Sequence, residues 1–348
     1  MHISEFDYCL PEELIAQNPV VPRDSSRLLV LDKKTGDITH NKFTDIVSMI
    51  NPGDLLVLND TRVIPARIYG QKVDSGGKAE LLLLKTNGND LWKALVKPGK
   101  RLKEGSIIEI GNLALMCEIL QFIPDGGRIV RFYQGVNANG KTVNDLIHEF
   151  GELPLPPYIY NGPTPDKRDV YQTVYARYEG SSAAPTAGLH FTDSIFDKLT
   201  NKGINTAFVT LHVGLGTFRP IQTENVMDHI IHEEWYEMPV ETAEKINRTK
   251  CDGGRVICVG TTSVRTVESC SDKSGRVNHS SGSTNIFITP GYKFKTVDAL
   301  ITNFHMPKST LLLLISALAG RDNVMKAYKS AIVENYRFLS FGDAMFIC

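Results

Sequence analysis

Three histidines of this chain stand where their imidazoles could move protons. His190 lies in a stretch of small residues, SSAAPTAGLHFT at 181–192, His212 precedes the glycine turn at 214–216, and His305 follows the apolar run LITN. Imidazole titrates near neutral pH and therefore serves as a general base or acid. His190 is also flanked by Leu189 and Phe191, so a buried histidine with a purely structural role is an equally open interpretation.

Hydroxyl and amide side chains follow other apolar runs. Gly260 leads into Thr261 and Thr262, the run LITN ends at Asn303, and Arg219 follows the glycine turn. Strand ends and helix starts in α/β proteins supply free N–H groups that bind carboxylates or phosphates. The alternative for each turn is helix capping without any ligand.

Metal and nucleotide motifs find little support in the sequence. His229 and His232 are spaced to share one face of a helix, but H-E-x-x-H is absent and no Cys or Asp completes a ligand set, so we expect no metal. The chain lacks a G-x-x-x-x-G-K-[ST] loop, the third glycine of a dinucleotide fingerprint, and a G-x-S-x-G turn.

The order of elements predicts an α/β protein: a mixed α/β main domain with an inserted small all-β barrel domain. The 348 residues suggest two domains at ~150 residues each. Residues 63–149 hold short β-rich runs separated by turns, which predicts the barrel domain. Residues 1–62 and 150–348 form the discontinuous α/β domain, with strands 207–211, 256–259 and 299–302 in one sheet.

Four further local predictions can be checked against the structure. Residues 27–43 favour a hairpin that turns at Thr35 and Gly36, and residues 10–17 and 169–178 favour helices. Residues 271–284 are interpreted as a flexible loop because Ser and Gly dominate there.

Composition restricts the partners. Lys and Arg number 38 and Asp and Glu 39, so the net charge is -1 and any RNA contact must be local. The best candidate is the turn-rich stretch with Lys97, Lys100, Arg101 and Lys103, which could equally be a solvated hairpin tip. No apolar run approaches the roughly 18 residues of a membrane span, no secretion signal is evident, and the cysteines are scattered, so we expect a cytoplasmic protein without membrane contact.

Ordered blocks along the whole chain resemble one family, the S-adenosylmethionine:tRNA ribosyltransferase-isomerases of queuosine biosynthesis. The blocks include FDYCLPEELIAQNP, NPGDLLVLNDTRVIPARI, FGELPLPPYI, AAPTAGLHFT, VTLHVGLGTFRPI, TTSVRTVES, VDALITNFHMPKSTLLLLISALAG and YRFLSFGDAMFI. One departure is Trp235, where the family more often has tyrosine.

The resemblance implies a reaction and its partners. The enzyme would transfer and isomerise the ribosyl group of S-adenosylmethionine onto 7-aminomethyl-7-deazaguanine at the wobble position of tRNA, giving epoxyqueuosine, adenine and methionine. The tRNA would carry a GUN anticodon, no metal or organic cofactor is expected, and the protein is expected to be a monomer. An α/β domain plus a small β-barrel is also implied.

Chemistry and resemblance together nominate the site residues. A base must remove the proton that the sulfonium acidifies, and an acid must protonate the departing adenine. We expect His190 and His212 to be base and acid in an order left open, with Asp60 and Asp343 as catalytic carboxylates. The expected substrate-binding residues are Arg62, Tyr158, Thr186, Phe191, Arg219, Thr262, Arg265, Asn303, His305 and Arg337, and Lys97, Lys100, Arg101 and Lys103 would grip tRNA phosphates.

Two other functions stay open at this point. An S-adenosylmethionine-dependent RNA methyltransferase would share the cosubstrate and the partner but release S-adenosylhomocysteine. The sequence offers no convincing glycine-rich loop after a first strand for that enzyme. A non-enzymatic tRNA-binding module would not need the polar strand ends, and the low basicity of the chain disfavours it.

Overall fold

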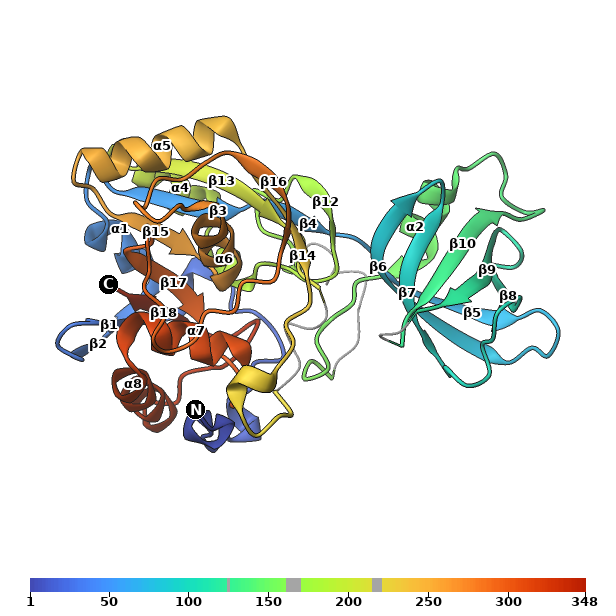
Figure 1. Ribbon diagram of the computed structural model, residues 1–348, viewed down its shortest axis with the longest axis horizontal. Coiled ribbons are helices and arrows are strands. Elements are labelled where there is room, and N and C mark those ends of the chain that lie inside the picture. The colour runs from blue at the N-terminus through green and yellow to red at the C-terminus, as the bar shows by residue number, and fades with distance from the viewer. Residues whose placement is uncertain (124–125, 161–169, 215–220) are drawn as a thin grey trace.

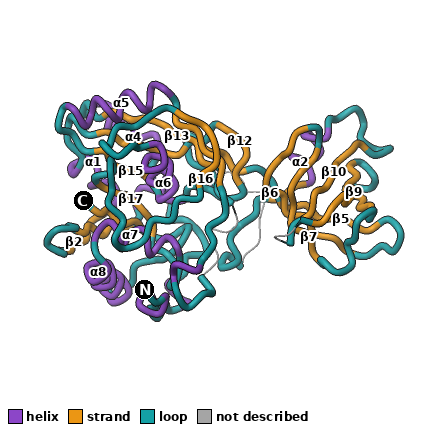
Figure 2. The backbone as a smooth tube through the Cα atoms, viewed as in Figure 1, coloured by secondary structure: helices purple, strands orange, loops and turns teal. Residues whose placement is uncertain are grey.

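The computed structural model describes residues 1–123, 126–160, 170–214 and 221–348. The chain forms a larger lobe, which holds both termini, and a smaller lobe built from the middle of the sequence (Figure 1). Helix is concentrated in the larger lobe, whereas the smaller lobe is mainly strand (Figure 2). Among the described residues, no helix has the length and apolarity that crossing a membrane requires.

The larger lobe is organised around a nine-stranded sheet in the order β16-β14-β13-β3-β15-β17-β18-β1-β2. Its strands are β1 (Arg27–Leu31), β2 (Ile38–Lys42), β3 (Leu55–Asn59), β13 (Asn205–Leu211), β14 (Glu234–Met238), β15 (Val256–Val259), β16 (Ser280–Thr284), β17 (Ala299–Asn303) and β18 (Ala344–Ile347). The neighbours β13, β3, β15 and β17 are parallel. The prediction that 207–211, 256–259 and 299–302 share one sheet is confirmed, as is the β1–β2 hairpin.

Helices cover both faces of this sheet, which explains why its central strands are continuous apolar runs. Leu55 and Val57 of β3 join the core cluster that includes residues of α5 (Val240–Cys251), α6 (Thr261–Cys270), α7 (Thr310–Ala319) and α8 (Arg321–Val333). Leu56 and Leu58 face the opposite cluster, which includes residues of α1 (Ile46–Met49) and α4 (Asp193–Asn201). The lobe is therefore a three-layer α/β/α structure.

The smaller lobe is a closed antiparallel barrel. Its strands are β5 (Arg67–Lys72), β6 (Lys78–Gly88), β7 (Leu91–Lys97), β8 (Ile107–Ile110), β9 (Leu115–Phe122) and β10 (Arg128–Gln134), with β11 (Gly151–Glu152) added beside β5. Pairing of β5 with β8 closes the barrel, and alternate residues point into its core. Helix α2 (Val143–Phe150) begins at a capping box of Thr142 and Asp145 and packs Leu146 and Ile147 against that core. The predicted fold class is confirmed.

Two short strands carry the chain between the lobes. β4 (Thr61–Val63) directly follows β3, β12 (Tyr178–Ser181) leads back toward α4, and the two pair in parallel. The barrel strands begin at Arg67 and α2 ends at Phe150. The predicted domain limits of 63 and 149 themselves stay a prediction.

Several local predictions are wrong. In place of a helix over 10–17 there is one short 3-10 turn, Glu12–Leu14. Residues 171–177 are turn and coil, and the Gln172 side-chain amide pairs with both backbone groups of Val63. The supposed loop 271–284 contains β16, paired with β14. His229 and His232 follow a 3-10 turn, Val226–Asp228, and lie on no helix.

Candidate functional site

The carboxyl ends of the four parallel strands meet at one edge of the large sheet, and a buried asparagine ties them together. Asn59, at the end of β3, is fully buried. Its Nδ2 donates to the carbonyl of Leu211 at 3.0 Å and to Thr262 Oγ1 at 3.1 Å, and its Oδ1 accepts from the N–H of Leu211 at 3.0 Å. This one side chain fixes the ends of β3 and β13 and the start of α6, so the turns that follow them keep a set spacing.

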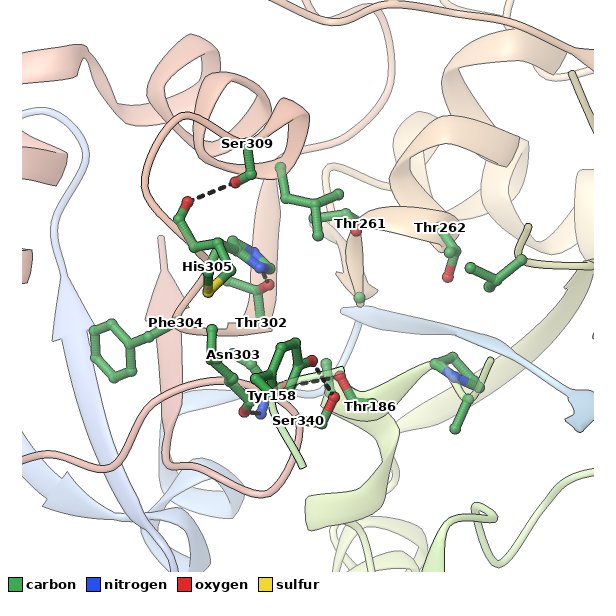
Figure 3. A pocket seen from close by; sticks show the side chains of 18 residues that line it. Tyr158, Thr186, Thr261, Thr262, Thr302, Asn303, Phe304, His305, Ser309 and Ser340 are labelled. Atoms are coloured by element: carbon green, nitrogen blue, oxygen red, sulfur yellow. Dashed lines mark hydrogen bonds between the residues drawn. The ribbon is translucent and has the colours of Figure 1, made fainter. Parts of the chain in front are cut away.

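A first cavity, here called the edge pocket, opens at this edge with a volume of about 70 Å³. Tyr158, Thr186 and Ser340 gather at one side of it, and His305 and Ser309 at another (Figure 3). The pocket is also lined by Gly260, Thr261, Thr262, Thr302, Asn303 and Leu311, among others. The sequence had marked Tyr158, Thr186, Thr262, Asn303 and His305 as substrate-binding, and the fold brings these five together.

Hydrogen bonds set the side chains of the edge pocket. The hydroxyls of Tyr158 and Ser340 are 2.7 Å apart, and Thr186 Oγ1 donates to Asn303 Oδ1 at 3.3 Å. His305 Nε2 lies 2.9 Å from Thr302 Oγ1, and burial lowers the pKa of His305 to about 3. His305 is therefore neutral at physiological pH and offers hydrogen bonds without charge.

A second cavity of about 710 Å³, the inter-lobe pocket, lies between the barrel and the large sheet. The barrel lobe contributes Trp92, Asn89, Asp90 and Lys85, with Asn144 and Ile147 of α2. The larger lobe contributes His212, Trp235, Glu179, His232, Glu233 and Glu234. The pocket therefore combines aromatic faces with a cluster of carboxylates.

His212 is held at the wall of the inter-lobe pocket by three neighbours. Its Nδ1 lies 2.8 Å from Thr61 Oγ1, and its ring stacks on Trp235 with 5.0 Å between ring centroids. Gly180 of β12 passes against the other side of the ring, where a Cβ would lie 2.6 Å from Nε2. Burial lowers the pKa of His212 to about 4, so the imidazole is neutral near pH 7 and can accept a proton.

A third cavity of about 250 Å³, the arginine pocket, shares lining residues with both of the others. It shares Gly214, His232 and Glu234 with the inter-lobe pocket, and Leu311 with the edge pocket. Arg265 lines it and forms a buried ion pair with Glu234, whose Oε1 also accepts from the N–H of Gly214 at 2.7 Å. The arginine pocket is therefore a neighbour of both other cavities.

His190 does not border any of these three cavities. Asn303 Nδ2 donates to its Nε2 at 3.2 Å, its Nδ1 lies 2.8 Å from Ser26 Oγ, and its ring stacks on Phe43. Burial, with Arg337 and Arg23 adding to it, lowers the pKa of His190 to about 3. Both ring nitrogens are thus occupied, and the contact that His190 makes toward the site is its support of Asn303.

The two candidate carboxylates are also held by protein groups away from the three pockets. Asp60 is buried, accepts from Thr210 Oγ1 at 2.7 Å, and has its pKa raised by that burial. The Asp343 carboxylate accepts hydrogen bonds from the backbone N–H of Arg27 at 3.0 Å and from the backbone N–H of Arg337 at 2.8 Å. Asp343 therefore ties the residues before β18 to the start of β1. The catalytic roles expected of Asp343, Asp60 and His190 stay predictions.

The remaining candidates are dispersed. Arg62 donates to the carbonyl of Ala176, Arg337 donates to that of Asn18, and Phe191 is buried in the core beside Phe43. Arg219 lies outside the described residues. Lys97, Lys100, Arg101 and Lys103 are exposed at the end of β7 and in the turn after it, and Lys100 and Lys103 border a shallow surface hollow with Phe122 and Arg128.

Sequence reasoning missed Asn59, Thr61, Gly180 and Glu234. Asn59 and Thr61 stand in the polar cluster that ends β3, which was a usable signal. Glu234 sits in the polar run HEE, and nothing there indicates that it becomes buried against Arg265.

Comparison with known proteins identifies the family. The family described as queuosine biosynthesis protein matches residues 3–347. Two relatives are the S-adenosylmethionine:tRNA ribosyltransferase-isomerases of Clostridioides difficile (strain 630), 54% identical, and Clostridium kluyveri, 55% identical, each aligned over 100% of both chains. The crystal structure of S-adenosylmethionine tRNA ribosyltransferase from Thermotoga maritima is 41% identical, with a TM-score of 0.57, over 99% of this chain and 100% of that one. The chain therefore belongs to the queuosine biosynthesis family.

Proposed function

We propose that this chain is an S-adenosylmethionine:tRNA ribosyltransferase-isomerase. It transfers the ribosyl group of S-adenosylmethionine to the aminomethyl group of 7-aminomethyl-7-deazaguanine in tRNA and isomerises it, giving epoxyqueuosine, adenine and methionine. The observation that carries the proposal is the set of three neighbouring pockets with shared lining residues, in a chain that matches such enzymes over its full length.

The inter-lobe pocket suits the modified base. Trp92 and the stacked pair of His212 and Trp235 supply flat faces for a base taken out of the anticodon loop. Carboxylates at Glu179 and Asp90 suit an aminomethyl group that arrives as an ammonium. The base binds there with its amine directed toward Gly214, where this pocket meets the arginine pocket.

The edge pocket suits one edge of the adenosine part of S-adenosylmethionine; at about 70 Å³ it does not enclose the whole nucleoside. It offers the ring of Tyr158 and hydrogen-bonding groups from Thr186, Thr262, Asn303 and His305. Its polar groups are neutral, since burial lowers the pKa of His305 to about 3, and this fits an uncharged adenine.

His212 is the residue we assign to proton removal from the carbon beside the sulfonium. It is neutral near pH 7, its Nδ1 is tied to Thr61, and Nε2 makes no hydrogen bond to the described residues. A base that is fixed at one nitrogen keeps the other directed at the proton it takes. The leaving adenine is assigned to the edge pocket, where the neutral imidazole of His305 can offer it a hydrogen bond.

The exposed cations Lys97, Lys100, Arg101 and Lys103 bind phosphates beside the anticodon in this proposal, and the preferred tRNA carries a GUN anticodon. The enzyme works as a monomer in the cytoplasm and uses S-adenosylmethionine as substrate, with no metal or organic cofactor.

The test is to incubate the protein with S-adenosylmethionine and tRNA that carries the deazaguanine precursor, and to separate the products by chromatography. Adenine and methionine are expected, and only with the precursor tRNA. tRNA with unmodified guanine is the control. S-adenosylhomocysteine would instead indicate a methyltransferase, and tRNA binding without turnover would indicate a module that only holds tRNA.

A further inference from the structure

Arg265 carries hydrogen-bond donors that the protein does not use. The residue is 7% exposed and lies on α6 one turn after Thr261 and Thr262, which line the edge pocket. Its Nη1 pairs with Glu234, but Nε and Nη2 are buried and have no partner among the described residues. A guanidinium has five N–H donors, so the pairing with Glu234 leaves a face of the group available.

A second unpartnered group lines the same cavity. Thr223 Oγ1 is buried without a hydrogen-bond partner in the described chain, and Thr223 and Arg265 both line the arginine pocket. Buried polar atoms in native proteins nearly always have partners. The cavity of about 250 Å³ is far larger than the ~10–15 Å³ that one water needs. Three donor atoms without acceptors, on two residues that line one cavity, therefore indicate a ligand that brings acceptor oxygens.

The charged residues around the cavity restrict which class of ligand it can bind. Glu234 lines it together with Arg265, and Glu233 lies in the adjoining inter-lobe pocket. A phosphate with two negative charges would face these carboxylates, whereas a zwitterion brings a cation for the carboxylates and a carboxylate for the arginine. The apolar wall formed by Ile286, Ile288, Leu311 and Leu314 suits an aliphatic chain between that head group and the edge pocket. These features describe an α-amino acid with an apolar side chain.

We propose that the arginine pocket binds the methionine part of S-adenosylmethionine, with its α-carboxylate on Nε and Nη2 of Arg265 and on the hydroxyl of Thr223. The inference rests on the proposed function. It adds that the enzyme selects its ribosyl donor by the α-carboxylate of the methionine part. The placement agrees with α6, because its first turn lines the edge pocket that takes one edge of the adenosine and its second turn carries Arg265. One helix thus positions both arms of the sulfonium.

The experiment compares S-adenosylmethionine with its decarboxylated form, which lacks only the carboxylate, as ribosyl donors at saturating precursor tRNA. In the unaltered enzyme we expect decarboxylation to lower kcat/KM about 10- to 100-fold, the range for hydrogen bonds to a charged group. In Arg265→Lys, which keeps a cation beside Glu234, the two donors should react nearly equally. Thr223→Val should reduce the preference less. Arg248→Lys, an exposed arginine on α5, is the matched control and should keep the full preference.

The possible outcomes distinguish failure of the carboxylate site from failure of the proposed ribosyltransferase activity. No adenine from S-adenosylmethionine with precursor tRNA would refute the proposed function itself. Adenine release with equal use of both donors by the unaltered enzyme would overturn the carboxylate site alone, and so would an undiminished preference in Arg265→Lys. If Arg265→Lys does not fold, the donor comparison in the unaltered enzyme and in Thr223→Val still decides.

Discussion

Replacing Gly180 by alanine should displace His212, although Gly180 itself has no assigned chemical role. Gly180 has φ +147, a region that residues with a side chain rarely adopt. A Cβ there would lie 2.6 Å from Nε2 and 2.8 Å from Cδ2 and Cε1 of His212. The ring cannot swing aside freely, because Thr61 holds Nδ1 and Trp235 covers one face. The backbone strain at residue 180 and the contact of the new Cβ with the ring therefore both disturb the position of His212.

The expected size of the effect differs between stability and activity. Strained backbone of this kind costs about 1–3 kcal/mol. At the usual unfolding entropy per residue, a chain of 348 residues loses about 1.4 °C of Tm per kcal/mol, so Tm should fall by roughly 1–4 °C. Displacing a general base costs about 10²- to 10⁴-fold in rate, so adenine release should fall far more than stability does.

Adenine release at saturating precursor tRNA, together with a thermal unfolding curve, measures both effects. Gly291→Ala is the matched control: it has φ +100 and no atom within 4 Å of the added Cβ, so it shares the backbone strain without the contact. We expect Gly291→Ala to lose a similar amount of Tm and to keep its activity. Full activity in Gly180→Ala would refute the assignment of His212 as the base.

Two further predictions concern the tRNA surface and the response to acid. Replacing all four cations, Lys97, Lys100, Arg101 and Lys103, by alanine should weaken tRNA binding and flatten its dependence on salt, because fewer counterions are released. The rate with S-adenosylmethionine at saturating tRNA should stay unchanged. If a filter-binding titration shows unchanged tRNA affinity, these four residues do not bind the tRNA phosphates. Burial lowers the pKa of His190 from 6.5 to about 3, so the native state resists its protonation and loses stability as the pH falls below 6.5, by about 2 kcal/mol at pH 5. His190→Gln should reduce the difference between urea unfolding at pH 7.5 and pH 5, and an identical difference would contradict that account.

The parts of the fold that were predictable are those with a strong local pattern. β15 and β17 are continuous apolar runs because helices cover both faces of the sheet, and the sequence shows those runs directly. The segment 171–177 was not predictable as coil, and its pairing of Gln172 with Val63, far away in the chain, is a contact that no local pattern shows. The polar strand β16 likewise forms because β14 offers it an edge, with Ser280 hydrogen-bonded to Tyr236.

Site residues at strand ends could be predicted from the sequence. Site residues whose position depends on contact between two elements far apart in the sequence could not. Thr262 and Asn303 were visible as strand-end residues and do line one pocket. Glu234 was not visible, since its burial is created by Arg265 from a helix in another part of the sequence. For His190 the sequence left a catalytic and a structural role equally open, and its bonds to Ser26 and Asn303 are contacts that periodicity could not show.

The place of β18 in the large sheet has a consequence for how the protein is made. Among the described strands, the hairpin of β1 and β2 joins the sheet through β18 alone, since β1 pairs with β2 and β18. Residues 27–42 leave the ribosome early, but their docking strand, Ala344–Ile347, follows only after on the order of tens of seconds at ordinary synthesis rates. All the barrel strands appear within that interval and pair mostly with near neighbours. During synthesis the barrel can therefore finish folding while the apolar face of the β1–β2 hairpin is still uncovered, so this hairpin is a segment of the nascent chain that a chaperone could protect.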